Sequence, residues 1–200
     1  MEKLKIYCLD LFNEDLEKIK KLKYEPVGLG QNNFDKDWIR DNSGKNISEK
    51  NKYFGEYTFH YWFWKNQIEK IDDDTWVGFC AYRRFWSEKS DATEIKSKKD
   101  FLKNVPDTWQ GSDAILGNEI CMDGWTTMKI LKHGLRSFVA NPKYIFKKNR
   151  NLKLHFDSFH GYGNLDKAIN ILHKEERNDF RNFMRDNNCY NRGNMFICKS

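Results

Sequence analysis

The sequence LKIYCLDL at residues 4–11 and the sequence YEPVGL at residues 24–29 decide the fold of this chain. Each is a short apolar run with the length of a buried strand; the first ends at Asp10 and the second is closed by Gly28. Between them, residues 13–22 carry leucine and isoleucine side chains at helical spacing behind an asparagine that suits a helix N-cap. This strand–helix–strand opening predicts a parallel sheet with a right-handed crossover.

The next stretch of the chain leads to a pair of arginines. Ser48 suits a helix N-cap, and apolar side chains recur after it at spacings of three and four, so we expect one long amphipathic helix that reaches about Lys70. The side chains that define this apolar face are Phe54, Tyr57, Tyr61, Trp64, Ile68 and Ile71. A strand at residues 76–80 follows, and residues 82–84, Tyr-Arg-Arg, come directly after it.

The second half of the chain carries shorter signals. They predict strands at residues 114–116 and 195–198 and helices at residues 126–133 and from residue 165 towards residue 184. No linker rich in proline or serine divides the sequence, so we expect a single domain over residues 1–200. Its class is α/β, with a mostly parallel, Rossmann-like sheet flanked by helices.

Charge and composition narrow the classes of partner. The chain is 39% hydrophobic and 16% aromatic, enough for a packed core, and its net charge of +6 favours an anionic partner. Nucleic acid, a membrane surface and a phosphorylated small molecule all meet that description. The sequence has no glycine–aromatic RNA motif and no basic recognition helix, so we expect no nucleic-acid partner. No apolar run approaches the roughly 18 residues of a membrane span, so we expect a cytoplasmic protein whose membrane contact, if any, is peripheral at the inner face.

The five cysteines are an odd number, widely spaced, and contain no Cys-x-x-Cys pair. This pattern argues against a disulfide framework and against a zinc site. Most of them stand among apolar neighbours, which favours buried free thiols in a reducing compartment.

Topology predicts where a ligand binds. In a parallel α/β sheet the helix N-termini and the strand C-termini lie at one edge, so the start of the long helix is expected to share a cleft with the arginine pair. A helix N-terminus and arginine forks both suit phosphate oxygens, which predicts a diphosphate site. The predicted diphosphate ligands are Asn46, Ser48, Lys50, Asn51, Tyr82, Arg83 and Arg84, and Asp10 and Gly28 are the predicted nucleotide ligands.

Several blocks of sequence occur in a characteristic order and spacing. They are NISEKN at residues 46–51, Glu56, YWFWKN at residues 61–66 and VGFCAYRRF at residues 77–85, with further agreement at residues 24–28, at His160 and in NMFI at residues 194–197. These blocks resemble the signature of the domain-of-unknown-function 4422 family, whose members look like glycosyltransferases of capsule and O-antigen assembly. The resemblance covers most of the chain.

The resemblance implies a fold similar to the GT-A glycosyltransferases and a nucleotide-sugar donor linked to UDP. The implied reaction transfers a hexosyl unit to a glycan or lipid-linked glycan acceptor. Two features depart from the family pattern: Ala81 stands where a histidine is usual, and the helical region that follows the Asn-Met-Phe strand is missing, so we expect an excerpt or a shortened member. These departures support an alternative reading, a catalytically impaired module that binds glycan or serves as a scaffold.

The predicted chemistry uses arginine charge in place of a metal ion. Many GT-A enzymes hold a divalent metal with an Asp-x-Asp motif after a core strand, and the resemblance implies that residues 81–84 occupy the equivalent place here. We therefore expect no required metal, with Mn²⁺ or Mg²⁺ as the alternative. Residues 72–74, three aspartates, precede their strand and are expected at the opposite edge. Glu56 and Asp157 are the candidate general bases, and His160 and Asn194 are candidates for binding the acceptor or the sugar.

Overall fold

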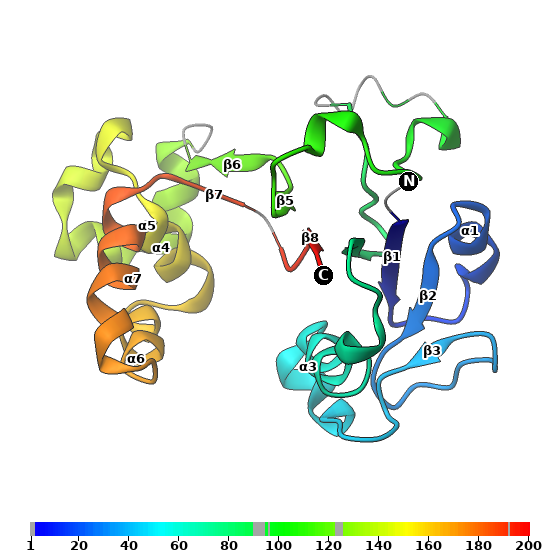
Figure 1. Ribbon diagram of the computed structural model, residues 1–200. Helices are drawn as coiled ribbons and strands as arrows, with labels where there is room; N and C mark the ends of the chain where they lie inside the picture. The colour runs from blue at the N-terminus through cyan, green and yellow to red at the C-terminus, as the bar shows by residue number, and fades with distance from the viewer. Residues whose placement is uncertain (1–2, 90–94, 96, 123–125, 192) are drawn as a thin grey trace. The chain divides into compact units, whose positions relative to one another are not determined.

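The chain divides into two units (Figure 1). The structure is a computed structural model and describes residues 3–89, 95, 97–122, 126–191 and 193–200. The first unit comprises Met1–Gly117 and Gly193–Ser200, and the second comprises Asn118–Arg192. The second unit is therefore inserted into the first along the chain. The single domain over residues 1–200 stays a prediction.

The first unit is built on a six-stranded mixed sheet with the strand order β3-β2-β1-β4-β8-β5. Its strands are β1 (Lys3–Asp10), β2 (Glu25–Gly28), β3 (Ile39–Arg40), β4 (Thr75–Ala81), β5 (Ala114–Leu116) and β8 (Phe196–Lys199). Strands β1 to β4 run parallel, whereas β8 is antiparallel to both β4 and β5. The predicted α/β class is confirmed, and β8 is the strand of this sheet that runs opposite to the other five.

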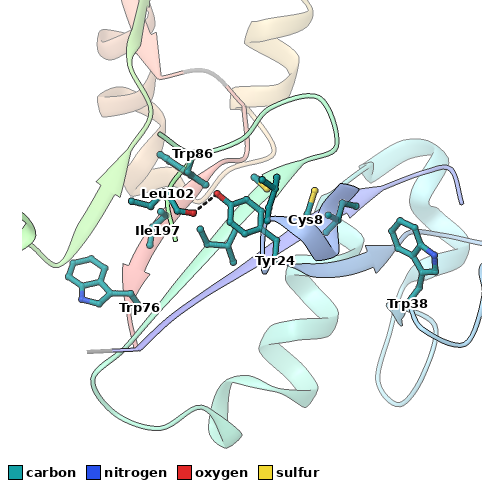
Figure 2. Packing of buried hydrophobic residues seen from close by; sticks show 11 residues of the cluster. Cys8, Tyr24, Trp38, Trp76, Trp86, Leu102 and Ile197 are labelled. Carbon is teal, nitrogen blue, oxygen red and sulfur yellow. Dashed lines mark hydrogen bonds between the residues drawn. The ribbon is translucent and has the colours of Figure 1, made fainter. Parts of the chain in front are cut away.

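Both faces of the sheet are buried, which explains why β1 and β4 are almost continuously apolar. Alternation along β1 sends Ile6 and Cys8 to one face and Tyr7 and Leu9 to the other. The first face packs against helix α1 (Leu16–Lys21) and the segment around Leu102, as Figure 2 shows. The hydroxyl of Tyr24 donates to the carbonyl of Leu102 at 2.8 Å in that layer. The second face packs against helix α3 (Tyr57–Asn66).

The predicted long helix is wrong, because a glycine interrupts it. The segment forms a 3-10 turn at Ser48–Lys50, a short helix α2 (Asn51–Phe54), helix α3 and a second 3-10 turn at Ile68–Lys70. Gly55 separates α2 from α3 with a φ of +53°, a left-handed conformation that favours glycine.

The predicted apolar face of this segment is also wrong. Phe59, Trp62 and Phe63 of α3 are buried against the sheet, whereas Tyr57 and Trp64, two of the predicted core residues, are more than half exposed. The segment is aromatic nearly all round, so periodicity by itself could not identify the buried side. Packing against Tyr7 and Phe79 on the sheet identifies it.

The second unit is a small helical body closed by a two-stranded ladder. Its elements are β6 (Glu119–Cys121), α4 (Thr127–Ala140), α5 (Leu152–His160), α6 (Asn164–Ile169), α7 (Lys174–Asp186) and β7 (Cys189–Asn191). Helices α4 and α5 pack against each other, and Phe138, Tyr144 and Leu154 form their small core.

A disulfide joins Cys121 to Cys189, so the prediction of buried free thiols with no disulfide framework is wrong for this pair. The two cysteines are 68 positions apart, and only the antiparallel pairing of β6 with β7 makes them direct neighbours. Sequence spacing carries no signal for such a pair. Cys8, Cys80 and Cys198 are free thiols.

Within the described part of the chain, no helix has the length and apolar character that crossing a membrane would require.

Candidate functional site

Asp10 lies at the carboxyl edge of the sheet between two of the predicted ligands. The register of the parallel strands places Asp10 beside Gly28 of β2. On the other side, the backbone N–H of Tyr82, one residue past β4, donates to the carbonyl of Leu9 at 3.1 Å. The prediction that these strand ends share one edge is confirmed, while their role in binding a nucleotide stays a prediction.

The carboxylate of Asp10 is buried with one oxygen unsatisfied. The residue is 1% exposed, and Oδ1 accepts a hydrogen bond from the backbone N–H of Phe12 at 2.9 Å. Oδ2 has no hydrogen-bond partner among the described residues. Burial raises the pKa of the Asp10 carboxyl, an effect opposed by hydrogen bonds from the Phe12 and Leu11 backbones. Since an unsatisfied buried acceptor costs about 1–3 kcal/mol, Oδ2 is a candidate acceptor for a ligand's donor group.

Arg40 and Asp41, which sequence reasoning missed, hold the loop at residues 28–30, called the glycine loop below. Arg40 donates from Nε to the carbonyl of Gly28 at 2.9 Å and from Nη2 to the carbonyl of Gly30 at 2.7 Å. Asp41 is fully buried and accepts the N–H of Gly30 at 3.0 Å and the hydroxyl of Thr58 at 2.6 Å. Burial is the main cause that raises the pKa of the Asp41 carboxyl. The two residues therefore position this loop against the start of α3.

Packing requires glycine at position 28. A Cβ atom there would lie 2.5 Å from Cγ of Phe34, whose ring covers that part of the backbone. The guanidinium of Arg40 lies over the same ring, 4.7 Å from its centroid. The glycine that the sequence marked as a nucleotide ligand thus has a structural role that only the tertiary packing reveals.

The segment at residues 46–51 is tied to this loop through its own side chains. The N–H and the hydroxyl of Ser48 donate to Oδ1 of Asn46 at 3.2 and 2.9 Å, and Nε2 of Gln31 donates to the Ser48 hydroxyl at 3.1 Å. The Asn51 amide donates to groups at the start of α3. Because α2 has only four residues, the segment lacks the long helix dipole that the prediction used, and the exposed Lys50 is its remaining charge for an anion.

Two exposed arginines follow β4 in a tight turn. The N–H of Arg84 donates to the carbonyl of Ala81 at 2.8 Å, and the Arg83 guanidinium lies 4.8 Å from the ring centroid of Tyr82. Neither arginine forms an ion pair with any carboxylate of the described residues. The turn therefore presents two exposed guanidiniums at the carboxyl end of β4.

A small recess beyond the end of β4 brings three predicted site residues together. Arg84, Glu56 at the start of α3 and Asn194 before β8 all line it, although they come from distant parts of the sequence. The Asn194 side-chain amide donates to Oε2 of Glu56 at 3.1 Å. The recess has a volume of about 10 Å³, about the space of one water molecule.

His60 also lines this recess, and sequence reasoning missed it. Its ring packs edge-on against Phe79 at 4.5 Å and stacks on Phe196 at 5.6 Å between centroids. Nε2 is buried and has no partner in the described part of the chain. Burial lowers the pKa of His60 to about 4, opposed by a hydrogen bond to the Asn194 backbone. The only sequence signal was its position one helical turn after Glu56.

This histidine predicts how stability depends on pH. In the folded chain the pKa of His60 is about 4, below its usual value of 6.5, so the unfolded chain binds the extra proton between these pH values. We expect the free energy of unfolding to fall by roughly 3 kcal/mol through this group as the pH drops from 6.5 to 4. Urea unfolding followed by tryptophan fluorescence should show a smaller decrease for His60→Asn, which has no titrating ring.

The matched control is His173→Asn, which removes an exposed histidine and should leave the pH dependence as in the wild type. Coincident pH profiles for the wild type and His60→Asn would contradict a neutral, buried His60.

The remaining two candidates belong to the second unit. Asp157 is buried, and the ammonium of Lys153 donates to its Oδ2 at 3.2 Å, while Oδ1 has no partner among the residues described. His160 is exposed at the end of α5, where its ring lies 4.5 Å from that of Phe156. The structure does not test their predicted roles as base and as acceptor ligand.

The three aspartates before β4 lie at the amino end of that strand, as the sequence predicted. Lys3 pairs with Asp72 at 2.7 Å, and Lys199 pairs with Asp74 at 3.3 Å. These exposed pairs stand at the opposite end of β4 from the arginines.

The fold and this edge define an α/β protein with a mostly parallel sheet flanked by helices. The chain aligns with the apo structure of the bifunctional glycosyltransferase WbbM at a TM-score of 0.50 and 21% sequence identity. The alignment covers 99% of this chain and 34% of that chain, so the chain spans about a third of the WbbM structure. At this identity the likeness shows the fold.

The chain belongs to the family described as Domain of unknown function (DUF4422), whose model matches residues 11–200. The resemblance found from the sequence motifs is thereby confirmed. The comparison with curated proteins found no match.

Proposed function

We propose that this chain is a glycosyltransferase that transfers a sugar from a nucleotide-sugar donor to a glycan acceptor. The observation that carries the proposal is the meeting of Arg84, Glu56 and Asn194 around one recess directly beyond the end of β4. A cation, a carboxylate and an amide are the groups that a diphosphate, a reacting hydroxyl and a sugar require. The glycosyltransferase-like fold supports the same reading.

The donor diphosphate binds to Arg83 and Arg84 in this proposal. Both guanidiniums are exposed and unpaired among the described residues, so they can form charge-assisted hydrogen bonds with phosphate oxygens. Their charge stabilises the nucleotide diphosphate that leaves during transfer, a task that a metal ion performs in many glycosyltransferases. Lys50 in the 3-10 turn before α2 and Asn51 at the start of α2 are further diphosphate ligands in this proposal.

Asp10 contacts the nucleoside. Its unsatisfied Oδ2 is buried at the same edge, next to Gly28 and the Tyr82 turn, and it can accept a hydrogen bond from a ribose hydroxyl or a base N–H. Such a bond would remove the cost of leaving this oxygen unsatisfied. Uracil offers an N–H donor, which is consistent with a UDP-linked sugar.

Glu56 is the general base in this proposal. Transfer requires the acceptor hydroxyl to lose its proton as it attacks the sugar, and a carboxylate within hydrogen-bond distance can take it. The Asn194 amide holds one oxygen of Glu56, which leaves the other available at the recess. The acceptor class is a glycan or lipid-linked glycan of surface polysaccharide, as the family resemblance implies.

A binding experiment tests the donor site. We expect UDP to raise the melting temperature of the chain without added metal, by roughly 5–10 °C at a concentration about 100 times its Kd. The measurement compares UDP, GDP and UMP, each with and without Mn²⁺. If UDP raises the melting temperature only when Mn²⁺ is present, the proposal that arginines replace the metal ion is wrong. If no nucleotide diphosphate stabilises the chain while an oligosaccharide does, the chain is instead a glycan-binding module.

A further inference from the structure

We infer that the α4 side of the second unit is a docking surface for a bilayer of anionic phospholipids. This surface, called the basic apolar surface below, consists of exposed residues of α4 and of the turns at Pro142–Ile145 and Lys147–Asn149 that follow it. The inference does not depend on the proposed glycosyltransferase activity.

Helix α4 presents a stripe of apolar side chains to solvent on both sides of a kink at Gly134. Its inner side is defined by Ser137 and Phe138, which are buried. Leu135 and Val139, after the kink, are four residues apart on one helical face and are 61% and 76% exposed, and Met128, before the kink, is 75% exposed. Apolar side chains in such a row on a solvent-facing helix mark an interaction surface.

The turns after α4 extend this stripe. The buried guanidinium of Arg150 donates to the hydroxyl of Thr127 at 2.7 Å and to the carbonyl of Ile145 at 3.2 Å. Arg150 therefore holds the turn next to the first residues of α4. Ile145 and Phe146 are 54% and 60% exposed there.

Positive charge surrounds these apolar side chains. The exposed cations of the surface are Lys132, Arg136, Lys143, Lys147 and Lys148. None of them pairs with a carboxylate of the described chain. The sequence contains no aspartate or glutamate from residue 124 to residue 156, so no acidic side chain of this stretch offsets the charge.

A polar hollow lies within the same surface. Lys143 and Lys148 line it together with Arg150 and Arg185, and its volume is about 490 Å³. The size and the cationic lining suit the phosphate of a lipid headgroup. Arg185 already pairs with Asp186 at 2.7 Å, which leaves the two lysines as the free cations of the hollow.

The combination of groups favours a membrane over a nucleic acid. A helix with cations beside an exposed apolar stripe lies in the headgroup region, where the apolar side chains enter the acyl boundary and the cations meet anionic headgroups. The phosphate backbone of a nucleic acid would contact the cations but would gain nothing from contact with exposed valine, leucine and methionine. The apolar stripe is thus the feature that separates the two partners.

Vesicle co-sedimentation of the 200-residue chain tests the inference. We expect binding to vesicles made of phosphatidylcholine and phosphatidylglycerol in equal parts, and little binding to phosphatidylcholine alone. Lys143→Gln with Lys148→Gln and, separately, Leu135→Gln with Val139→Gln should each weaken binding on the order of tenfold. These side chains are exposed, so circular dichroism should show the fold unchanged.

The control variants change the same chemistry elsewhere in the second unit. Lys167→Gln with Lys174→Gln removes two exposed charges, and Ile171→Gln removes an apolar side chain that is 86% exposed. Both should bind like the wild type. Three outcomes would overturn the inference: no binding by the folded chain, equal losses in the control variants, or tighter binding to an oligonucleotide with no effect of the Leu135 and Val139 changes.

Discussion

Replacement of both Arg83 and Arg84 by alanine is expected to weaken UDP binding about a hundredfold or more. Hydrogen bonds to a charged group contribute about 1.5–3 kcal/mol each, and two guanidiniums would be lost from one diphosphate. Isothermal titration calorimetry with UDP measures the change directly. The side chains are exposed, so the stability of the chain should change little.

Two further variants separate a specific site from general charge. Lys70→Ala with Lys103→Ala removes the same charge from exposed positions of the first unit and should leave UDP affinity near the wild-type value. Arg83→Lys with Arg84→Lys keeps the charge but loses the planar fork, so we expect an intermediate affinity. If the lysine control weakens binding as much as the alanine pair does, the arginine turn is not the diphosphate site.

Removal of the disulfide is expected to destabilise the second unit by about 4 kcal/mol. The bond closes a loop between positions 68 apart, and the chain-entropy relation assigns that cost to a loop of this length. Cys121→Ser with Cys189→Ser, unfolded in urea without reductant and followed by far-ultraviolet circular dichroism, gives the difference from the wild type.

Reductant supplies the control within the same experiment. It should destabilise the wild type towards the double serine variant and leave that variant unchanged. Cys198→Ser, which removes a free and partly buried thiol, should respond to reductant as the wild type does. A wild-type chain that contains five titratable thiols after unfolding would show that the bond does not form in solution.

Much of the parallel half of the sheet followed from sequence alone. The runs that became β1, β2 and β4 are apolar because both faces of the sheet are covered, and their short length, with Gly28 closing the second, identified them as strands. The right-handed crossover rule then placed Asp10, Gly28 and the Tyr82 turn at one edge. The arginine pair was identified for the same reason, because it follows a strand whose direction was already known.

Other parts of the candidate site needed the folded chain. Arg40 ends a strand of two residues and Asp41 follows it, and because so short a strand gives no sequence signal, their hydrogen bonds to the glycine loop could not be predicted. His60 lies in a segment that is aromatic on every side, and its burial depends on Phe79 and Phe196 from other strands.

The family motifs, the strands and the arginine turn could be predicted from the sequence, because each of them consists of consecutive or closely spaced residues. The recess beyond β4 and the Cys121–Cys189 bond were decided by pairing between segments far apart in the chain, the first by the return of β8 beside β4 and the second by the register of β6 with β7. Such pairings depend on which surfaces can be buried together. Which segments pair is therefore decided by the packing of the complete chain, and short stretches of sequence do not reveal it.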